Sequence, residues 1–286
     1  MRAKLDFLCG MLREMGKVAV AFSGGVDSAF LIRIASECLP ERVLALTAVS
    51  ILTPQGEPEE ARQTADSMGV PHKVIEFSPL PIPGFSQNPP NRCYLCKKKL
   101  FELLLQAARR SGFDYIIEGT NSDDGKEFRP GLQALTELCI PSPLDRAGFT
   151  KQEIRHLSRE LGLSTWNKPP STCLATRFPY YRDITGEGID RVKRAEFEIT
   201  NLGYRSVRVR AVGEDAWIEI ESSRIDEFLE REGREGVLQR IRNIGFRNVV
   251  LDREGYRSGK LDERWGVFIS DSGEGRIEHV SQNSLV

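Results

Sequence analysis

The residues best suited to chemistry lie in a glycine-rich segment near the start of the chain, Ser23-Gly24-Gly25-Val26-Asp27-Ser28. This segment follows a β-forming run, residues 17–22, and precedes a helical pattern over residues 29–39. A glycine-rich turn in this context directs several backbone N–H groups toward one point, and the helix adds the positive end of its dipole. Asp27 can contact a magnesium ion, and Ser28 can donate a hydrogen bond. The segment therefore predicts a pyrophosphate-binding loop for ATP and Mg2+.

The same segment lacks the lysine of a Walker A loop, so transfer of the γ-phosphate is not indicated. The alternative is an ordinary glycine-rich turn between a strand and a helix, which would not require the whole hexapeptide. We therefore predict that ATP is bound by Ser23, Gly24, Gly25, Asp27 and Ser28, and that Asp27 is also catalytic.

A second polar segment, residues 118–124, follows a predicted strand over residues 114–118. A glycine there lets the backbone approach a ligand closely, and its Thr, Asn and Asp side chains offer hydrogen bonds or a magnesium contact. The alternative is an Asn/Asp turn that caps the next segment. The residues predicted to join the ATP site are Gly119, Thr120, Asn121 and Asp124, with Arg129 as a further phosphate partner.

Three cysteines lie among polar residues and require a chemical explanation. Cys93 and Cys96 form a C-x-x-C unit followed by three lysines at a predicted helix start, residue 97. Positive charge and a helix N-terminus both lower thiol pKa values. A redox pair, a zinc site, a persulfide on Cys173 without metal, and plain structural thiols all remain open. We favour an iron–sulfur cluster held by Cys93, Cys96 and Cys173 with one open iron, because soft thiolates are its usual ligands.

The other three cysteines, Cys9, Cys38 and Cys139, lie in apolar patterns and are predicted to be core thiols. Six cysteines in 286 residues are too few for a disulfide scaffold. The N-terminus does not resemble a signal peptide, so reduced thiols and a cytoplasmic location are expected.

Strands alternating with helices must position these segments. Short β-forming runs at residues 17–22, 42–49, 72–77 and 114–118 are separated by helical patterns, which is typical of an α/β fold with a parallel sheet. A helix over residues 148–161 is expected to begin at Thr150, with Glu153 completing a capping box. Helices on both faces of the sheet are expected.

The pattern changes to α+β after about residue 186. We predict an ATP domain over residues 1–185, a smaller substrate domain over 186–273 and a tail over 274–286. A weak repeat, Leu202–Val207 and Ile244–Val249, predicts two helix–Gly–strand units in one small sheet. The net charge is −1, so neither nucleic acid nor an anionic membrane surface is required as a partner. No apolar run is long enough to span a bilayer.

Several motifs in order along nearly the whole chain resemble the LarE family of the PP-loop ATP pyrophosphatases. They are Asn88–Tyr94, Gly119–Asp124, Arg129–Leu132, Ser142–Leu144, Trp166–Pro169, Cys173–Arg177 and Gly255–Gly259. The resemblance implies cleavage of ATP between its α and β phosphates and adenylation of a substrate carboxylate. It implies the conversion of pyridinium-3,5-biscarboxylic acid mononucleotide into thiocarboxylates for the nickel-pincer nucleotide, with a sulfur donor that the sequence does not identify.

The resemblance also assigns roles to residues. One branch of the family sacrifices the sulfur of a single cysteine, which corresponds to Cys173, and another holds a [4Fe-4S] cluster on three cysteines. The C-x-x-C unit places this sequence with the second branch. Substrate binding is assigned to Glu196, Arg208, Arg210 and Glu219. By itself, Val207–Arg210 predicts a strand with two arginines on one face, suited to carboxylate or phosphate, or else a solvated face.

Two other functions remain possible from the sequence. One is a tRNA thiolase of the same superfamily with the same cluster, which would need an extended basic surface. The other is a non-enzymatic protein that binds ATP or an iron–sulfur cluster. A homo-oligomer is expected.

Overall fold

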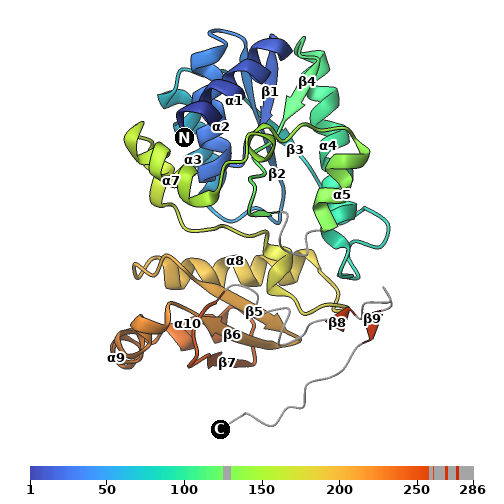
Figure 1. The fold of residues 1–286 in the computed structure, drawn as a ribbon. Helices are drawn as coiled ribbons and strands as arrows, with labels where there is room; N and C mark the ends of the chain where they lie inside the picture. The colour runs from blue at the N-terminus through green and yellow to red at the C-terminus, as the bar shows by residue number, and fades with distance from the viewer. Residues whose placement is uncertain (125–129, 258–259, 261–267, 270–274, 277–286) are drawn as a thin grey trace. The chain divides into compact units, whose positions relative to one another are not determined.

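The computed structural model describes residues 1–124, 130–257, 260, 268–269 and 275–276. The chain divides into two compact units (Figure 1). The first unit comprises Met1–Ile82 and Asn91–Ser171, and the second comprises Pro83–Pro90 and Thr172–Val286. No helix in the described part of the chain is long and apolar enough to cross a membrane.

The first unit is built on a four-stranded sheet with the order β3-β2-β1-β4. The strands are β1 (Val18–Ala21), β2 (Val43–Val49), β3 (His72–Glu76) and β4 (Tyr115–Ile117). All three strand pairs are parallel. The predicted α/β fold with a parallel sheet is therefore confirmed.

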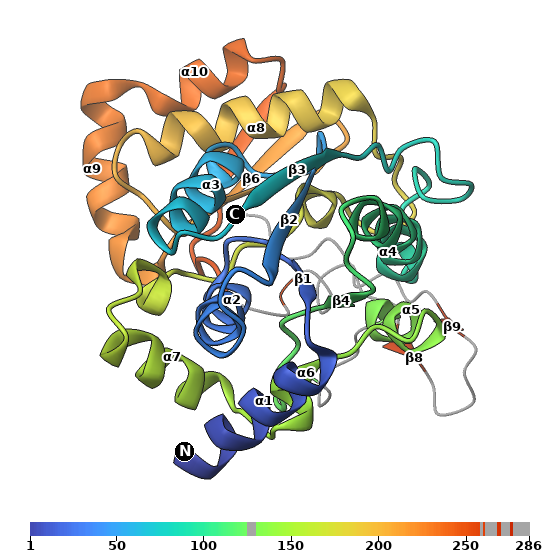
Figure 2. The same cartoon turned by 90° about the horizontal axis from the view of Figure 1, so that it is seen from above.

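Helices cover both faces of this sheet, as Figure 2 shows. Val18 and Val20 of β1 pack with α1, α2 and α7, whereas Ala19 packs with α4 and α5. Because successive residues of a strand point to opposite faces, this division requires an apolar strand without alternation. The helices of the unit are α1 (Arg2–Met15), α2 (Val26–Cys38), α3 (Glu57–Ser67), α4 (Arg92–Arg110), α5 (Pro130–Glu137), α6 (Pro143–Arg146), α7 (Lys151–Glu160) and the 3-10 helix η2 (Ser164–Asn167).

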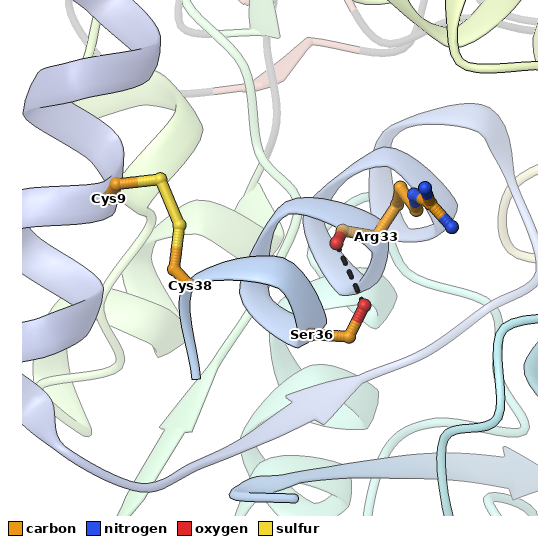
Figure 3. The surroundings of a disulfide bond; sticks show 4 residues. All are labelled: Cys9, Arg33, Ser36 and Cys38. Atoms are coloured by element: carbon orange, nitrogen blue, oxygen red, sulfur yellow. Dashed lines mark hydrogen bonds between the residues drawn. A yellow bond between two sulfur atoms is a disulfide. The ribbon is translucent and has the colours of Figure 1, made fainter. Parts of the chain in front are cut away.

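The cysteines outside the polar segments differ from their prediction. Cys9 of α1 and Cys38 at the end of α2 form a disulfide (Figure 3) and are not reduced core thiols. The apolar periodicity that predicts burial cannot reveal that the two positions face each other across packed helices. Cys139 is exposed at a positive φ of 52°, because the chain turns there while its neighbour Ile140 enters the core.

The start of α7 agrees with its prediction. Thr150 accepts a hydrogen bond from the backbone N–H of Glu153, and the Glu153 carboxylate accepts one from the N–H of Thr150. The ammonium of Lys4 lies 2.7 Å from the same carboxylate. The capping box is therefore confirmed, and it fixes the entry of the helix whose first residue, Lys151, belongs to the site described below.

The second unit contains a three-stranded sheet with the order β5-β6-β7. Strands β5 (Arg208–Val212) and β6 (Asp215–Glu219) are antiparallel, and β7 (Asn248–Leu251) is parallel to β6. The two strands of the sequence repeat, β5 and β7, lie in this one sheet, as predicted. Figure 1 shows α8 running beside β5. The other elements are α8 (Gly186–Thr200), α9 (Ile225–Glu235), α10 (Val237–Asn243), the 3-10 helices η3 (Leu174–Arg177) and η4 (Ser222–Arg224), and the short pair β8 (Phe268–Ile269) and β9 (Gly275–Arg276).

Residues 83–90 join the second unit through a set of hydrogen bonds with residues 178–184. The N–H of Ile184 donates to the carbonyl of Ser86, and the Asn88 side-chain amide donates to two carbonyls, those of Phe178 and Pro179. In the structure, the boundary between the two units lies after Ser171. The domain limits at residues 185 and 273 stay a prediction.

The capping box provides a test of local stability. Thr150→Ala should lower the free energy of unfolding by about 1 kcal/mol, because one N–H at the start of α7 loses its partner. Urea denaturation followed by circular dichroism measures the change. Thr136→Ala is the matched control, since the exposed Thr136 hydroxyl donates to a carbonyl within α5. Equal effects of the two substitutions would contradict the role of the cap.

Candidate functional site

A cavity of about 330 Å3 lies in the first unit where the loops after β1 and β4 meet. One part of its wall is polar, formed by Ser23, Gly25, Asp27, Ser28, Lys97, Glu118, Gly119, Thr120 and Asp124. The other part is largely apolar, formed by Ala21, Phe22, Leu46, Ala48, Leu100, Phe101 and Leu104. A site with these two halves suits a ligand that has both an aromatic ring system and charged oxygens.

The loop after β1 has the local structure that phosphate binding requires. Gly24 has a φ of +72°, and a Cβ atom there would lie 3.1 Å from the Cβ of Ala61. The N-cap of α2 is Gly25, so no side chain at this position caps the first N–H groups of the helix. The hydroxyls of Ser23 and Ser28 lie 3.2 Å apart. The first N–H groups of α2 are therefore available to an anion.

The loop after β4 approaches this helix start very closely. A Cβ atom on Gly119 would lie 3.0 Å from the backbone nitrogen of Ser28. The side-chain amide of Asn121 lies 3.5 Å from a carboxylate oxygen of Asp27. Asp124 lines the cavity, and its carboxylate accepts the N–H of Asn121. The Asn121 side-chain oxygen accepts the N–H of Asp123, so the segment also forms the Asn/Asp turn of the alternative interpretation. The structure brings the two predicted segments together.

Three lysines surround the loop, and the sequence interpretation assigned them no role in ATP binding. The ammonium of Lys151 lies 2.5 Å from the carboxylate of Asp27. Lys168 donates to the carbonyl of Gly24 and pairs with Glu60 at 2.8 Å. Lys97 lines the cavity and lies 3.8 Å from Glu118. Positive charge that a Walker lysine would supply within the loop is therefore supplied by residues far away in the sequence.

Two sequence signals could have identified two of these lysines. Lys97 directly follows the C-x-x-C unit, and Lys168 lies in the Trp166–Pro169 motif. Lys151 has no comparable signal beyond its place next to a helix cap. Arg129 and residues 258–259 lie outside the described residues.

The two cysteines of the C-x-x-C unit lie in the first turn of α4, which begins at Arg92 and not at residue 97 as predicted. No helix breaker follows Pro90, so the helix can start five residues earlier than the lysine run suggested. Residues three apart on a helix share a face, so Cys93 and Cys96 share one. Cys93 and Cys173 are exposed, and Cys96 is half-buried. Within the described ranges, no three His, Cys, Asp or Glu side chains are grouped closely enough to hold a metal ion.

The second unit contains a buried cluster of charged side chains on β5 and β6. Arg208 and Arg210 point to the same face of β5 and are 7% and 4% exposed, so the solvated-face interpretation is wrong. Arg210 lies 2.7 Å from the carboxylate of Glu219 and also donates to the carbonyl of Thr176. Arg208 stacks 4.7 Å from the centre of the Tyr256 ring. Burial, and then the neighbouring charge of Arg177, lowers the pKa of the Arg208 guanidinium.

Glu196 joins this cluster through Arg177, a residue to which the sequence interpretation gave no role. The guanidinium of Arg177 makes two hydrogen bonds to the Glu196 carboxylate, at 2.7 and 3.2 Å. The cluster therefore contains three arginines, at 177, 208 and 210, and two glutamates, at 196 and 219. With every side chain ionised, the cluster carries a net charge of +1. The Nε of Arg210 and one carboxylate oxygen of Glu219 are buried without a hydrogen-bond partner in the described structure. This arrangement suits an anionic ligand.

Comparison with known proteins identifies the family. Residues 1–120 match the NAD synthase family. The chain is 39% identical to an uncharacterised protein of Synechocystis sp., over 92% of this chain and 98% of that protein. It is 34% identical to the pyridinium-3,5-bisthiocarboxylic acid mononucleotide synthase of Lactiplantibacillus plantarum, over 90% of this chain and 92% of that protein. The chain belongs to the LarE family.

More distant relatives match a smaller share of the chain. The tRNA-specific 2-thiouridylase MnmA of Desulforamulus reducens is 29% identical over 54% of this chain and 53% of that protein. The match to LarE, in contrast, extends over most of both chains. Membership of LarE and the PP-loop superfamily therefore agrees with the α/β fold and with the loop after β1.

The approach of Gly119 to α2 provides a test of the ATP site. Gly119→Ala should weaken ATP binding by about tenfold or more, because the new methyl group forces two backbone segments apart at a cost of about 1–3 kcal/mol. Isothermal titration with ATP and Mg2+ measures the affinity. Gly10→Ala is the control, since nothing lies within 4 Å of the added atom on α1. Unchanged ATP affinity in Gly119→Ala would contradict the geometry.

Proposed function

We propose that this protein is an ATP-dependent sulfur transferase acting on pyridinium-3,5-biscarboxylic acid mononucleotide. It adenylates a carboxylate of this nucleotide with release of pyrophosphate, and a sulfur nucleophile then displaces AMP to leave a thiocarboxylate. The observation that carries the proposal lies in the second unit. There, Arg210 bonds both to Glu219 and to the turn that follows Cys173, so an anion site and a sulfur-bearing residue share one network. The name of the Lactiplantibacillus plantarum relative supports the choice of substrate.

The ATP half of the proposal uses the cavity of the first unit. The N–H groups and hydroxyls of Ser23, Gly24, Gly25 and Ser28 hold the phosphates. Gly119 and Thr120 complete the wall of the cavity, and Asn121 supports it through Asp27. The apolar wall accepts the adenine. Lys97 and Lys151 add positive charge beside the phosphates, which stabilises pyrophosphate as it leaves. A cradle of fixed donors without a Walker lysine favours cleavage between the α and β phosphates.

Magnesium fits the same cavity, because the carboxylates of Asp27 and Asp124 are the hard oxygen ligands that this ion prefers. The ion would neutralise phosphate charge when bound. Asp27 is the better placed of the two, since it also contacts Asn121 and Lys151. Its roles are to orient the ion and to keep the two loops together.

The substrate half uses the buried cluster of the second unit. Arg208 and Arg210 bind the phosphate or carboxylate groups of the nucleotide, because guanidinium groups make paired hydrogen bonds to both. Glu219 and Glu196 hold the arginines in place and limit the positive charge to an excess of one. An excess charge is costly in a buried site, and an anionic ligand would neutralise it.

We further propose that Cys93, Cys96 and Cys173 hold a [4Fe-4S] cluster. Two thiols on one face of a helix start, beside a lysine, fit ligation by thiolates. The cluster would supply a reusable site for sulfur when bound, in place of a sacrificed Cys173 thiol. The sulfur donor is a sulfide-level compound that restores the protein after each turnover. A cytoplasmic location and a homo-oligomer stay predictions from the sequence.

Thiolation of tRNA is the alternative, because several partial relatives are tRNA-specific 2-thiouridylases. A protein that binds ATP or a cluster without catalysis is the other. Anaerobic incubation with ATP, Mg2+, sulfide and either the biscarboxylated nucleotide or tRNA distinguishes them. The proposal expects AMP, pyrophosphate and a thiocarboxylated nucleotide, with no thiolated tRNA. Absence of AMP with both substrates would favour the non-catalytic alternative.

Asp27→Ala should abolish AMP formation, because the loops lose their shared carboxylate and the magnesium ligand. Separation of nucleotides by chromatography measures AMP and ADP. Asp66→Ala is the control, since Asp66 pairs with Arg62 on the exposed face of α3. The formation of ADP and orthophosphate by the unmodified protein would exclude this reaction.

Arg208→Ala should weaken binding of the nucleotide substrate by about 1.5–3 kcal/mol, the contribution of a charged hydrogen bond, and leave ATP affinity unchanged. Titration of each ligand measures the two affinities. Arg224→Ala is a close control, because Arg224 also stacks on a tyrosine ring, 4.1 Å from the centre of Tyr204, in the same unit. An equal loss of ATP affinity would argue against separate sites for the two ligands.

The cluster proposal has its own test. Anaerobically purified protein should contain iron and sulfide, and Cys93→Ser should lose both, whereas Cys139→Ser should retain them. After turnover, intact-mass analysis should find Cys173 unchanged. Loss of hydrogen sulfide from Cys173 would instead support the sacrificial route.

A further inference from the structure

The turn that carries Cys173 is held by Arg177, which the proposed function does not use. Arg177 is only 2% exposed and is the last residue of η3. Its Nη1 donates to the hydroxyl of Thr172 at 2.7 Å and to the hydroxyl of Thr176 at 2.8 Å, and it lies 3.3 Å from the carbonyl of Thr172. These two threonines stand on either side of Cys173.

Thr176, in turn, hydrogen-bonds to the backbone of Cys173. The hydroxyl of Thr176 donates to the carbonyl of Cys173 at 2.8 Å, and its backbone N–H donates to the same carbonyl at 3.0 Å. One guanidinium nitrogen therefore fixes the residue before Cys173 and the residue that closes its turn. The position of the Cys173 backbone depends on where the Arg177 side chain is anchored.

Glu196 provides that anchor. Its carboxylate accepts hydrogen bonds from Nε and Nη2 of Arg177, and one of its oxygens also accepts the backbone N–H of Val209 at 3.0 Å. Val209 lies between Arg208 and Arg210 on β5. A chain of hydrogen bonds thus leads from the Cys173 turn through Arg177 and Glu196 to the strand of the proposed substrate site.

The chemistry of the position requires arginine. A planar guanidinium with five N–H donors can bond a carboxylate on one edge and two threonines on the other, whereas an ammonium group has three donors at one point. Apolar residues can replace a buried ion pair with little loss of stability when stability is its only contribution. Here the pair instead fixes the geometry of a turn that carries a thiol.

We propose that Arg177 is a positioning residue for Cys173, and that it holds the Cys173 turn at a fixed place relative to Arg208 and Arg210. This inference rests on the proposed function for its catalytic consequence. The proposed function assigns the contacts with the substrate nucleotide to Arg208 and Arg210. Loss of the hold of Arg177 on the turn should lower the delivery of sulfur more than adenylation, because misplacement of the residue that presents the sulfur by about 1 Å can cost about a hundredfold in rate.

Two variants test the proposal. Arg177→Lys keeps the charge but loses the fork of donors. Thr172→Val keeps the buried Arg177–Glu196 pair and removes only the Thr172 hydroxyl, which accepts from Arg177 and lies 3.4 Å from the Thr176 hydroxyl. It therefore remains informative if Arg177→Lys does not fold. Arg231→Lys is the matched control, since Arg231 likewise bonds a glutamate, Glu235, and a backbone carbonyl, that of Leu202.

The first measurement is the amount of thiocarboxylate formed for each AMP released, in anaerobic reactions with ATP, Mg2+, sulfide and the biscarboxylated nucleotide. We expect a ratio that falls about tenfold or more in Arg177→Lys. Thr172→Val should show a smaller fall, with AMP release within about twofold of the unmodified protein. Arg231→Lys should leave both unchanged. If AMP and thiocarboxylate fall in proportion, Arg177 has only a structural role and the proposal is overturned.

The second measurement does not depend on the proposed function. Hydrogen–deuterium exchange of a peptide covering residues 172–177 should be faster in both variants, because the Thr176 N–H loses protection, while a peptide around Cys139 serves as an internal reference. Unchanged exchange at residues 172–177 would overturn the proposal. If the unmodified protein makes no AMP, the proposed function fails, and this exchange result still decides whether Arg177 holds the turn.

Discussion

The proposed pyrophosphate site after β1 depends on the close approach of the loop after β4, which carries no side chain at Gly119. A Cβ atom on Gly119 would lie 3.0 Å from the nitrogen of Ser28, so any other residue there would force the two loops apart. Neighbouring parallel strands bring both loops to one edge of the sheet. The contact of Asn121 with Asp27, the polar wall of the cavity and the reach of Lys151 all depend on this approach.

A different constraint organises the second unit, where three buried arginines lie around β5 and β6 with the buried Glu219 and the half-buried Glu196. Burial of an excess charge is costly, so each guanidinium is directed by a fixed partner: Glu196, Glu219 or the Tyr256 ring. The same partners connect the strand to the Cys173 turn. The proposed chemistry needs both constraints, one to activate a carboxylate and one to bring sulfur to it.

The sequence predicted features that depend on neighbouring residues. Apolar runs between helical patterns indicated the parallel sheet, and Thr150 with Glu153 indicated the start of α7. It could not reveal contacts between distant residues. Lys151 reaches Asp27 across 124 positions, and the Cys9–Cys38 disulfide depends on how two helices face each other. Arg177 lay within a recognised motif, but its partner Glu196 follows 19 positions later on another helix. The start of α4 was predicted at Lys97, five residues too late. No proline or glycine lies between Pro90 and the lysines, so the helix can begin at Arg92.

The most direct test of the account follows an oxygen atom through the reaction. If a substrate carboxylate attacks the α-phosphorus of ATP, one of its oxygens remains on AMP when sulfur displaces the nucleotide. We predict that biscarboxylated nucleotide labelled with oxygen-18 in its carboxylates yields AMP carrying one labelled oxygen for each thiocarboxylate formed, measured by mass spectrometry. Label in orthophosphate or pyrophosphate, or thiocarboxylate formed together with unlabelled AMP, would contradict adenylation of the carboxylate.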